Sequence, residues 1–341
     1  MVYALPVIAS RPESPQLAVE HVSPRSVRIS VTDRCDMACV YCRPSMLDGY
    51  LPAEDRLGVA EWETLVAGLV RAGVRRVRIT GGEPLLFKGL VDVISRVRAL
   101  GVDDLAMTTN ASRLERLAKP LRDAGLQRIT VSLDSLDAAR FSSITRGGDL
   151  SAVLRGVDAA VAAGFDEVKT NTVVLRGEND DELDRIVAWA WARGITPRFI
   201  EVMGVGEGGR IWRDKLVSAA DQRALLAGLL VDAPGERDPD RGPSKYVLAR
   251  DGSGRRVGFI TGSTDTYCAG CDRLRATSDG MLRPCLSTND GVSVADDLRD
   301  GADAEVVSAR LREAWAMKPD DRWKGCTEET ARRVNMRATG G

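Results

Sequence analysis

A regular alternation of short β-branched segments and amphipathic segments between residues 27 and 203 is the strongest constraint on the fold. The first kind has the length and pattern of buried strands, and the second has the period of helices. Such alternation specifies a parallel sheet with right-handed crossovers. Six units are fewer than the usual eight of a closed barrel, so an open doubly wound sheet and a partial barrel both fit. The predicted strands are 27–32, 75–80, 105–109, 128–133, 167–175 and 196–203, and the predicted helices are 59–72, 90–100, 112–124, 150–163 and 180–193.

Each predicted strand ends in polar or glycine-rich residues where the next loop begins. Parallel α/β folds collect their sites at the carboxyl ends of the strands. Any one of these ends fits ordinary turn chemistry, but six of them on one edge predict a single site. The six ends are residues 32–33 (TD), 80–84 (TGGEP), 108–110 (TTN), 132–134 (SLD), 169–171 (KTN) and 201–203 (EVM). Ser112, with Glu115 three residues later, is expected to cap the third helix.

A cysteine triad follows the first predicted strand. Cys35, Cys39 and Cys42 have the spacing CxxxCxxC. Soft thiolates select iron–sulfur clusters, zinc or copper(I), and three thiols on a four-iron cluster leave one iron open to a further ligand. A structural zinc site usually has four Cys or His ligands, and the chain's only histidine, His21, precedes the strand and so is not part of this loop. A disulfide would use two of the three thiols and leave the third unpaired. The triad therefore favours an iron–sulfur site, with zinc or no metal as alternatives.

A second set of three thiols lies in the last third of the chain. Cys268 and Cys271 form a CxxC pair, and Cys285 follows fourteen residues later. This pattern is moderately specific for a metal site, with a three-cysteine zinc site or a redox dithiol as alternatives. Cys326 has no ligand spacing and fits a free thiol better than a fourth ligand. The residues between these thiols include two arginines on an extended segment, whose guanidinium groups would point the same way and suit phosphate or carboxylate oxygens. They are Arg273 and Arg275, for which two solvated arginines are the alternative.

Composition excludes several classes of protein. The chain has 341 residues and a formal net charge of −1, so bulk charge gives no attraction to nucleic acid or membranes. No apolar run reaches the length of a membrane span, and residues 1–20 lack the pattern of a secretory signal. Seven cysteines without an export signal indicate metal or redox chemistry in the cytoplasm. Residues 204–209 fit GxGxxG but follow the last strand of the series, so a flexible loop is expected there. Residues 232–244 look like a linker, and 245–248 and 256–260 like two antiparallel strands.

The cysteine motif, with an aromatic residue, Tyr41, before its third cysteine, resembles the radical S-adenosylmethionine (SAM) enzymes. Further segments narrow the resemblance to the GTP 3′,8-cyclase family, which begins molybdenum cofactor biosynthesis. They are SVTDRCDMACVYC, VRITGGEPLL, TTN, VSLDSLD, VKTNTVVLRG, RFIEVM, CAGCDRLR, the lone Cys285 and the terminal Gly-Gly. The resemblance implies an α/β fold, a partial (β/α)6 TIM-type barrel with a C-terminal α+β extension that carries a second cluster. The expected parts are an arm (1–24), the barrel (25–235) and the C-terminal region (236–341), whose Gly340-Gly341 tail reaches the active site.

The resemblance also implies roles for single residues and a set of cofactors. The family uses two 4Fe–4S clusters and SAM, takes an electron from an external donor, removes the 3′ hydrogen of the GTP ribose and joins C3′ to guanine C8. A cyclic pyranopterin monophosphate synthase acts next, and a homodimer is a family expectation. The first cluster would be held by Cys35, Cys39 and Cys42, and the second by Cys268, Cys271 and Cys285. The residues that would contact SAM are Tyr41, Gly82, Ser132 and Met203. The residues that would contact GTP are Arg28, Arg78, Thr108, Lys169, Arg273, Leu274 and Arg275. Arg273 and Arg275 would also be catalytic.

Three positions depart from the family pattern. Asp36 stands where Asn is commoner, Ala111 follows TTN in place of Gly, and Asp272 follows the CxxC pair in place of Asn. Asp272 places a negative charge beside the expected phosphate site. Two other functions stay open: a peptide-modifying radical SAM enzyme with an auxiliary cluster, and a non-catalytic metal-binding scaffold.

Overall fold

The structure is a computed structural model, and it describes residues 24–43, 49–238, 242–268, 270–319, 334 and 336–339. The predicted N-terminal arm up to residue 23, which contains His21, lies outside these ranges, as do Cys326 and the Gly340-Gly341 tail.

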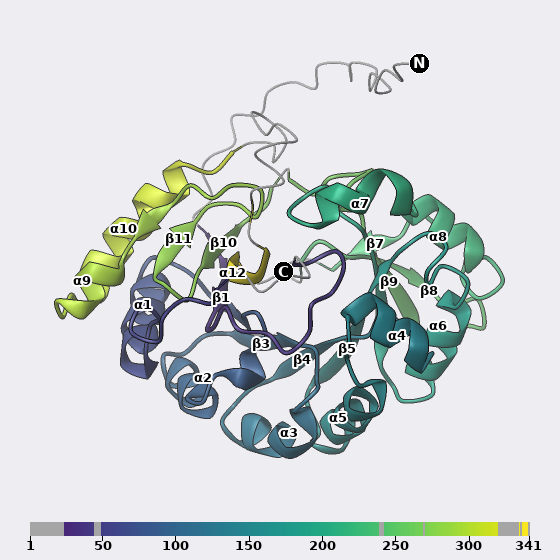
Figure 1. The fold of residues 1–341 in the computed structure, drawn as a ribbon, viewed down its shortest axis with the longest axis horizontal. Helices are drawn as coiled ribbons and strands as arrows, with labels where there is room; N and C mark the ends of the chain where they lie inside the picture. Colours follow the sequence, from purple (N-terminus) through teal and green to yellow (C-terminus); the bar gives the residue numbers. More distant parts are fainter. Residues whose placement is uncertain are drawn as a thin grey trace.

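One curved, open sheet of twelve strands forms the centre of the described chain (Figure 1). Six parallel strands, β1 to β6, follow one another in chain order across its middle. The strands are β1 (Ser26–Ser30), β2 (Arg76–Thr80), β3 (Asp104–Thr109), β4 (Arg128–Ser132), β5 (Glu167–Val174), β6 (Thr196–Glu201), β7 (Glu236–Arg237), β8 (Lys245–Leu248), β9 (Arg256–Ile260), β10 (Arg273–Ala276), β11 (Met281–Arg283) and β12 (Val292–Ser293). The sheet does not close, because its two ends are β12 and β7. The predicted partial barrel is thereby confirmed.

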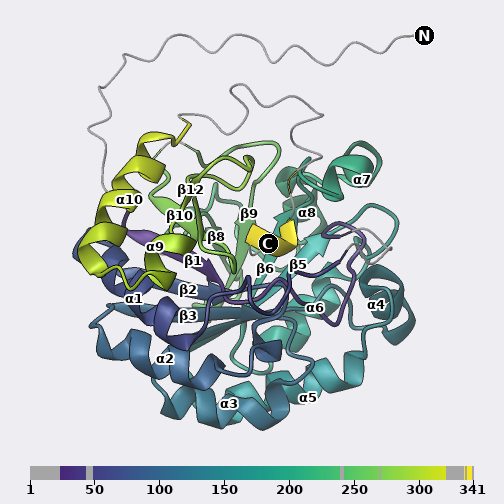
Figure 2. The ribbon, with the colours of Figure 1, turned by 60° about the vertical axis from the view of Figure 1, so that its left-hand side comes forward.

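Helices cover the convex face of this sheet (Figures 1 and 2). The longer ones bury an apolar stripe, as α1 does with Trp62, Leu65 and Leu69. The helices are α1 (Val59–Arg71), α2 (Leu90–Ala99), α3 (Leu114–Asp123), α4 (Ala138–Thr145), α5 (Leu150–Ala162), α6 (Leu183–Trp191), α7 (Gly208–Lys215), α8 (Ala219–Leu225), α9 (Ala295–Arg299), α10 (Ala304–Ala316) and α12 (Met336–Thr339), with a short 3₁₀ turn η1 (Pro84–Leu86).

The last third of the chain continues the same sheet at both edges. β9 pairs in parallel with β6, and β10 pairs in parallel with β1. The register places Arg28 of β1 between Arg78 of β2 and Arg275 of β10. Strand alternation then directs these three arginines to the concave face, while Val27 and Leu274 are fully buried in the apolar core. The concave face is therefore rich in cations before any loop is considered.

α10 covers α1 at the edge of the barrel that carries β10 to β12 (Figure 1). The helices approach so closely that a Cβ on Gly68 of α1 would overlap the side chain of Val307 on α10. Glycine is required there by space, because its backbone angles are ordinary for a helix. This contact fixes the end of α10 beside the second cysteine set.

Three local expectations were wrong, and one helix was not foreseen. Ser112 does not cap α3, which begins at Leu114 after Arg113; its hydroxyl instead donates to Asp36. α6 begins at Leu183, because the preceding residues form a hydrogen-bonded turn. The expected flexible loop at 204–209 contains the start of α7. α4, capped by Asp137, lies in a stretch where no helix was predicted.

Candidate active site

A cavity of about 260 Å³ opens at the carboxyl ends of β1 to β6. It is lined by residues from almost every central strand and by Met336 of α12, which lies over the mouth of the barrel (Figures 1 and 2). Twelve of the residues expected to bind a cluster, SAM or GTP line it: Cys35, Cys39, Cys42, Tyr41, Gly82, Ser132, Met203, Arg28, Arg78, Thr108, Arg273 and Arg275. The structure therefore brings the first cysteine triad and the cations to one space.

The loop that carries the first triad is held by backbone contacts on two sides. Gly82 N donates to Thr32 O at 2.6 Å, and Glu83 N donates to Arg34 O at 2.7 Å. A Cβ on Gly82 would overlap the carbonyl group of Arg34, so only glycine allows this approach. On the other side, Ala38 N and Val40 N each donate to a carbonyl at the end of α4, both at 3.0 Å. The GGEP turn thus fixes the cysteine loop as well as lining the cavity.

The first triad lies in a buried, electronegative environment. Burial and the nearby Glu83 raise the pKa of the Cys35 thiol to about 12. Burial and Asp134 raise the pKa of Cys39 well above its usual value. Deprotonating these thiols without a bound cation is therefore costly, and iron would displace their protons. None of the described cysteines forms a disulfide.

The first triad offers three thiols on one loop to a metal group. Within the described ranges, no three His, Cys, Asp or Glu side chains converge on a point that would hold one metal ion. Three half-buried thiolates on one loop are also the donor type that iron–sulfur clusters require.

Tyr41, between two of these cysteines, is anchored by Asp134. Its hydroxyl donates to Asp134 Oδ2 at 2.6 Å, and Val173 N donates to the other carboxylate oxygen at 2.9 Å. Burial raises the pKa of Asp134 to about 6. Asn179 donates to the Asp134 carbonyl at 2.7 Å. This buried carboxyl therefore joins the cysteine loop to β5.

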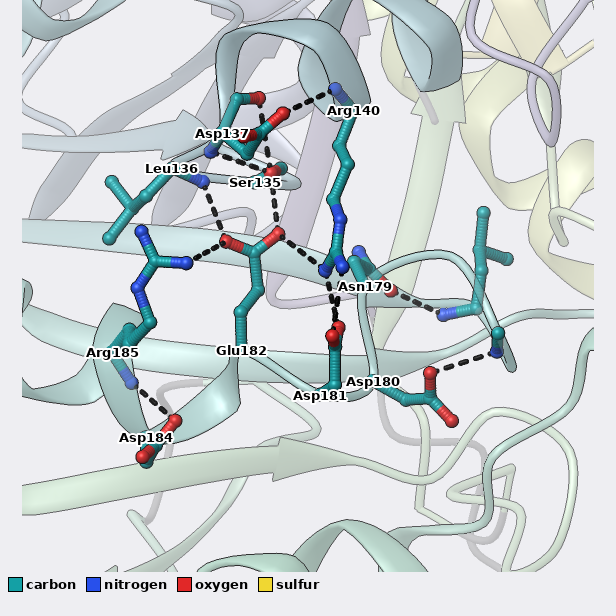
Figure 3. A network of polar contacts seen from close by, with 12 residues as sticks. Ser135, Leu136, Asp137, Arg140, Asn179, Asp180, Asp181, Glu182, Asp184 and Arg185 are labelled. Atoms are coloured by element: carbon teal, nitrogen blue, oxygen red, sulfur yellow. Dashed lines mark hydrogen bonds and ion pairs between the residues drawn. The ribbon is translucent and has the colours of Figure 1, made fainter.

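A second layer of polar contacts holds the segment behind Asp134 (Figure 3). The side chain of Glu182 is buried and accepts from the Ser135 hydroxyl and from Leu136 N at 3.2 Å. Arg140 reaches Glu182 at 3.7 Å and also pairs with Asp181. The β4–α4 and β5–α6 loops are thereby joined at the rim of the barrel.

Glu83 connects the GGEP turn to the TTN turn. The Thr109 hydroxyl donates to Oε1 at 2.6 Å, Leu85 N donates to the same oxygen at 3.0 Å, and Asn110 N donates to Oε2 at 2.7 Å. Burial outweighs these donors and raises the pKa of Glu83 to about 7 from an ordinary 4.5. The protonated form is therefore favoured by folding, so this stability is present below pH 4.5 and is lost as the pH rises through about 7.

We expect Glu83→Gln, which cannot ionise, to lose less stability than the wild type when the pH is raised from about 6 to about 8.5, by on the order of 1 kcal/mol. Urea unfolding of the metal-free protein under reducing conditions at both pH values measures the difference. Glu115→Gln, on the surface of α3, is the matched control. Parallel pH dependence of Glu83→Gln and the wild type would contradict the account.

Eight arginines line the cavity, and their charges act on one another. Burial, together with repulsion by Arg275 and Arg78, lowers the pKa of Arg28 well below its usual value. Burial and Arg198 lower the pKa of Arg78 to about 10, and burial and Arg273 do the same for Arg275. Guanidinium groups that destabilise one another in a cavity form a site for a multiply charged anion.

Two buried polar atoms beside these cations lack hydrogen-bond partners within the described chain. They are Nε of Arg198 and Oδ1 of Asn171, and both residues line the cavity. Buried polar groups are rarely left unsatisfied without a ligand or water. A polar ligand in the cavity would satisfy them.

Two of the expected GTP contacts do not line the cavity. Lys169 is buried beside it, where Nζ donates to the Tyr246 hydroxyl at 3.0 Å and pairs with Glu167 at 2.9 Å. Burial and Arg198 lower the pKa of Lys169. Leu274 lies in the apolar core between its two arginine neighbours. A side-chain contact of Leu274 with a ligand therefore has no support in the structure.

The second cysteine set lies next to the cavity, behind Tyr267 and Leu286, which do line it. Burial alone would raise the pKa of Cys271, but Arg273 and Lys318 lower it to about 7. Charge on Cys285 and Cys271 in turn favours the charged form of Arg275. The two cysteine sets therefore differ in electrostatics: the first is surrounded by carboxylates, and the second by cations.

Asp272 is compensated, contrary to the expectation that its charge would oppose a phosphate. Its carboxylate pairs with Arg76 of β2, and its carbonyl accepts from Arg25 N and Ser26 N, both at 3.2 Å. Asp272 thereby ties the segment after Cys271 to β1 and β2. The negative charge is neutralised within the sheet.

We expect Arg76→Met to weaken GTP binding about tenfold, because it leaves the Asp272 carboxylate uncompensated at the cavity. The double variant Arg76→Met/Asp272→Asn should return to within about threefold of the wild type. Titration of GTP against the metal-free protein at low salt measures both. A double variant as weak as the single one would show that Arg76 acts on GTP directly.

Sequence reasoning overlooked several residues of the site. Arg198 and Arg76 occupy inward positions of predicted strands, so the alternation could have identified them. Asp134 belongs to a quoted motif, but its bond to Tyr41 depends on a contact between distant loops. Lys318 follows a helix, α10, that was not predicted.

Comparisons with known proteins agree with this geometry. The family model described as "Radical SAM superfamily" matches residues 29–190, and that described as "Molybdenum Cofactor Synthesis C" matches residues 195–323. A GTP 3′,8-cyclase of Pelotomaculum thermopropionicum is 42% identical over 296 residues, which cover 86% of this chain and 91% of that protein. A GTP 3′,8-cyclase of Pseudomonas putida is 42% identical over 298 residues, covering 86% and 88%.

Solved structures show the same architecture at low sequence identity. Streptococcus suis SuiB bound to S-adenosylmethionine is similar with a TM-score of 0.59 and 15% identity, covering 91% of this chain and 70% of that one. SuiB bound to its precursor peptide SuiA gives a TM-score of 0.57 and 18% identity, covering 89% and 66%. At this identity the likeness concerns the fold alone.

Proposed function

The chain belongs to the GTP 3′,8-cyclase family of radical SAM enzymes, and from this premise we propose that its cavity holds GTP between two iron–sulfur sites. The enzyme converts GTP to (8S)-3′,8-cyclo-7,8-dihydroguanosine 5′-triphosphate, the first step of molybdenum cofactor biosynthesis. Its cofactors are 4Fe–4S clusters and SAM. The assignment of residues to these ligands is the proposal.

Cys35, Cys39 and Cys42 hold the first cluster in this proposal. When bound, that cluster and SAM together supply an electron and a hydrogen-atom acceptor. The loop contacts of Tyr41 and Gly82 keep the three thiols on one wall of the cavity. Ser132 and Met203 line the adjoining wall, where SAM would contact them.

The arginine cluster binds the triphosphate, and this is the observation that carries the proposal. Burial and the charges of neighbouring arginines lower the pKa of Arg28, Arg78 and Arg275, in a cavity that the cysteine triad also lines. A triphosphate would relieve this repulsion and accept from Nε of Arg198, and a hydroxyl or N–H group of the nucleoside would donate to Oδ1 of Asn171. Thr108 adds a hydroxyl to the same wall.

Cys268, Cys271 and Cys285 hold the second cluster, and the guanine ring lies toward it. Arg273 would lie between the second cluster and GTP, because it lines the cavity and its side chain interacts with the Cys271 thiol. Its guanidinium also stacks on Tyr267 at 4.7 Å. Holding ribose and base in one orientation is the main contribution of these residues to a ring closure. Lys169 would act through Tyr246 and Glu167, outside the first layer around GTP.

The test is anaerobic turnover of the reconstituted protein with SAM and a strong reductant, with and without GTP. We expect about eight iron atoms per chain, release of 5′-deoxyadenosine that depends on GTP, and a cyclised guanosine nucleotide by mass spectrometry. If 5′-deoxyadenosine is released at the same rate without GTP, the protein is still a radical SAM enzyme, but GTP is not its substrate. A fully iron-loaded protein that does not cleave SAM would contradict its assignment as a radical SAM enzyme.

The wider setting is proposed from the family. It comprises a cytoplasmic location, an external electron donor, the cyclic pyranopterin monophosphate synthase as the enzyme that takes the product, and a homodimer. No helix in the described part of the chain has the length and apolarity needed to cross a membrane. The likeness to the peptide-bound SuiB concerns the fold, so it gives no support to a peptide substrate.

A further inference from the structure

Lys318 bridges the two segments that carry the second cysteine set. Its Nζ donates to the carbonyl of Arg273 and to that of Pro284, each at 2.8 Å. Arg273 follows Cys271 by two residues, and Pro284 directly precedes Cys285. One ammonium group therefore spans both parts of the set.

The position of Lys318 is fixed from behind. It lies two residues after α10, and Lys318 N donates to Trp315 O at 3.0 Å. Its ammonium group lies 4.6 Å from the centre of the Trp315 ring. α10 is in turn held against α1 by the close contact at Gly68. The lysine is thus oriented by a rigid element outside both cysteine segments.

The bridge does not serve the helix itself. A lysine near a helix C-terminus usually interacts with the last carbonyls of its own helix, whereas Lys318 reaches carbonyls of β10 and of the residue after β11. Both bonds come from a charged donor in a partly buried place, where such bonds are strong. The same charge lies near Cys271 and Cys285.

We propose that Lys318 is a positioning residue for the second cluster, holding the Cys271 and Cys285 segments at the separation that three-cysteine ligation requires. The positive charge also favours the reduced, more negative state of a bound cluster. This inference rests on the proposed function, because it presumes a cluster at the second set. The residue does not contact the cavity and is no catalytic residue in this account.

The test compares Lys318→Met, Lys318→Arg and the control Lys119→Met, whose lysine lies on the surface of α3 and pairs with Asp123. In the metal-free protein, hydrogen exchange of segment 272–286 should be about tenfold faster in Lys318→Met than in the wild type. After reconstitution, Lys318→Met should lose second-cluster iron to a chelator about tenfold faster and show a lower potential for that cluster. Lys318→Arg should lie between, and Lys119→Met should match the wild type.

The outcomes separate this inference from the proposed function. A wild type with about four iron atoms per chain, all on the first triad, would remove the second cluster and with it the premise. A wild type with both clusters, together with a Lys318→Met protein of unchanged exchange, iron retention and potential, would overturn the role of Lys318 alone. Circular dichroism shows whether Lys318→Met folds. If it does not fold, the comparison is made with Lys318→Arg, whose unchanged exchange, iron retention and potential would overturn the role of Lys318.

Discussion

Cys39→Ser is expected to abolish reductive cleavage of SAM, lowering 5′-deoxyadenosine release at least a thousandfold, on the order expected when a cofactor carries the chemistry. Cys39 is the middle member of the first triad; it is half-buried and lies near Asp134. A serine hydroxyl is a poor ligand for iron, and its deprotonation there would cost more than that of the thiol, because an alcohol is the weaker acid. Iron content should fall from about eight to about four atoms per chain.

Cys271→Ser is the matched variant in the other set. It should lose a similar amount of iron but keep the ability to cleave SAM, because the first triad is intact. The GTP product should disappear. Cys326→Ser, a thiol expected to be free, should keep full iron content. Equal loss of SAM cleavage in Cys39→Ser and Cys271→Ser would contradict the division of labour between the two sets.

Arg275→Ala is expected to lower GTP-dependent turnover by about a hundredfold to a thousandfold, as for a preorganised cation at the reacting substrate. Arg275 stands beside Arg28 in the sheet register and lines the cavity. Its Nη1 also donates to the carbonyl of Thr339 in α12 at 2.7 Å. The variant therefore loses the proposed phosphate contact as well as the link between the sheet and the segment over the cavity.

Kinetics distinguish these two losses. Arg275→Lys keeps the charge and should recover part of the GTP affinity, but it lacks the planar fork that can serve phosphate and carbonyl together. Arg116→Ala, on the exposed face of α3, is the control and should behave as the wild type. An Arg275→Ala enzyme that retains wild-type kcat/KM for GTP would remove the phosphate assignment.

The strand–helix alternation predicted a parallel sheet whose strand ends share one edge, and the family resemblance decided between an open sheet and a partial barrel. The resemblance also implied that Arg28, Arg78, Arg273 and Arg275 share one site, and the structure places all four on the cavity. The cysteine motif fixed the first thiol set on the loop after β1. These predictions depend on local sequence, on rules of connection and on the family resemblance.

The remainder depends on contacts between distant segments. The Asp272–Arg76 pair exists because β10 pairs in parallel with β1, a partner that no local pattern identifies. Ser112 was expected to cap a helix, but α3 begins at Leu114 and the Ser112 hydroxyl donates to Asp36, which is distant in sequence. Predicting the position of Lys318 would have required the path of α10 over α1. In each of these cases, contacts with a segment distant in sequence determined where the polar group lies.

The central claim is that this cavity holds the GTP ribose where its 3′ hydrogen is removed. GTP deuterated at C3′, given anaerobically to the reconstituted enzyme with SAM and reductant, tests it directly. The account predicts 5′-deoxyadenosine that carries one deuterium from this substrate and none from GTP deuterated at C2′. Unlabelled 5′-deoxyadenosine formed at the normal rate from the 3′-deuterated substrate would contradict it.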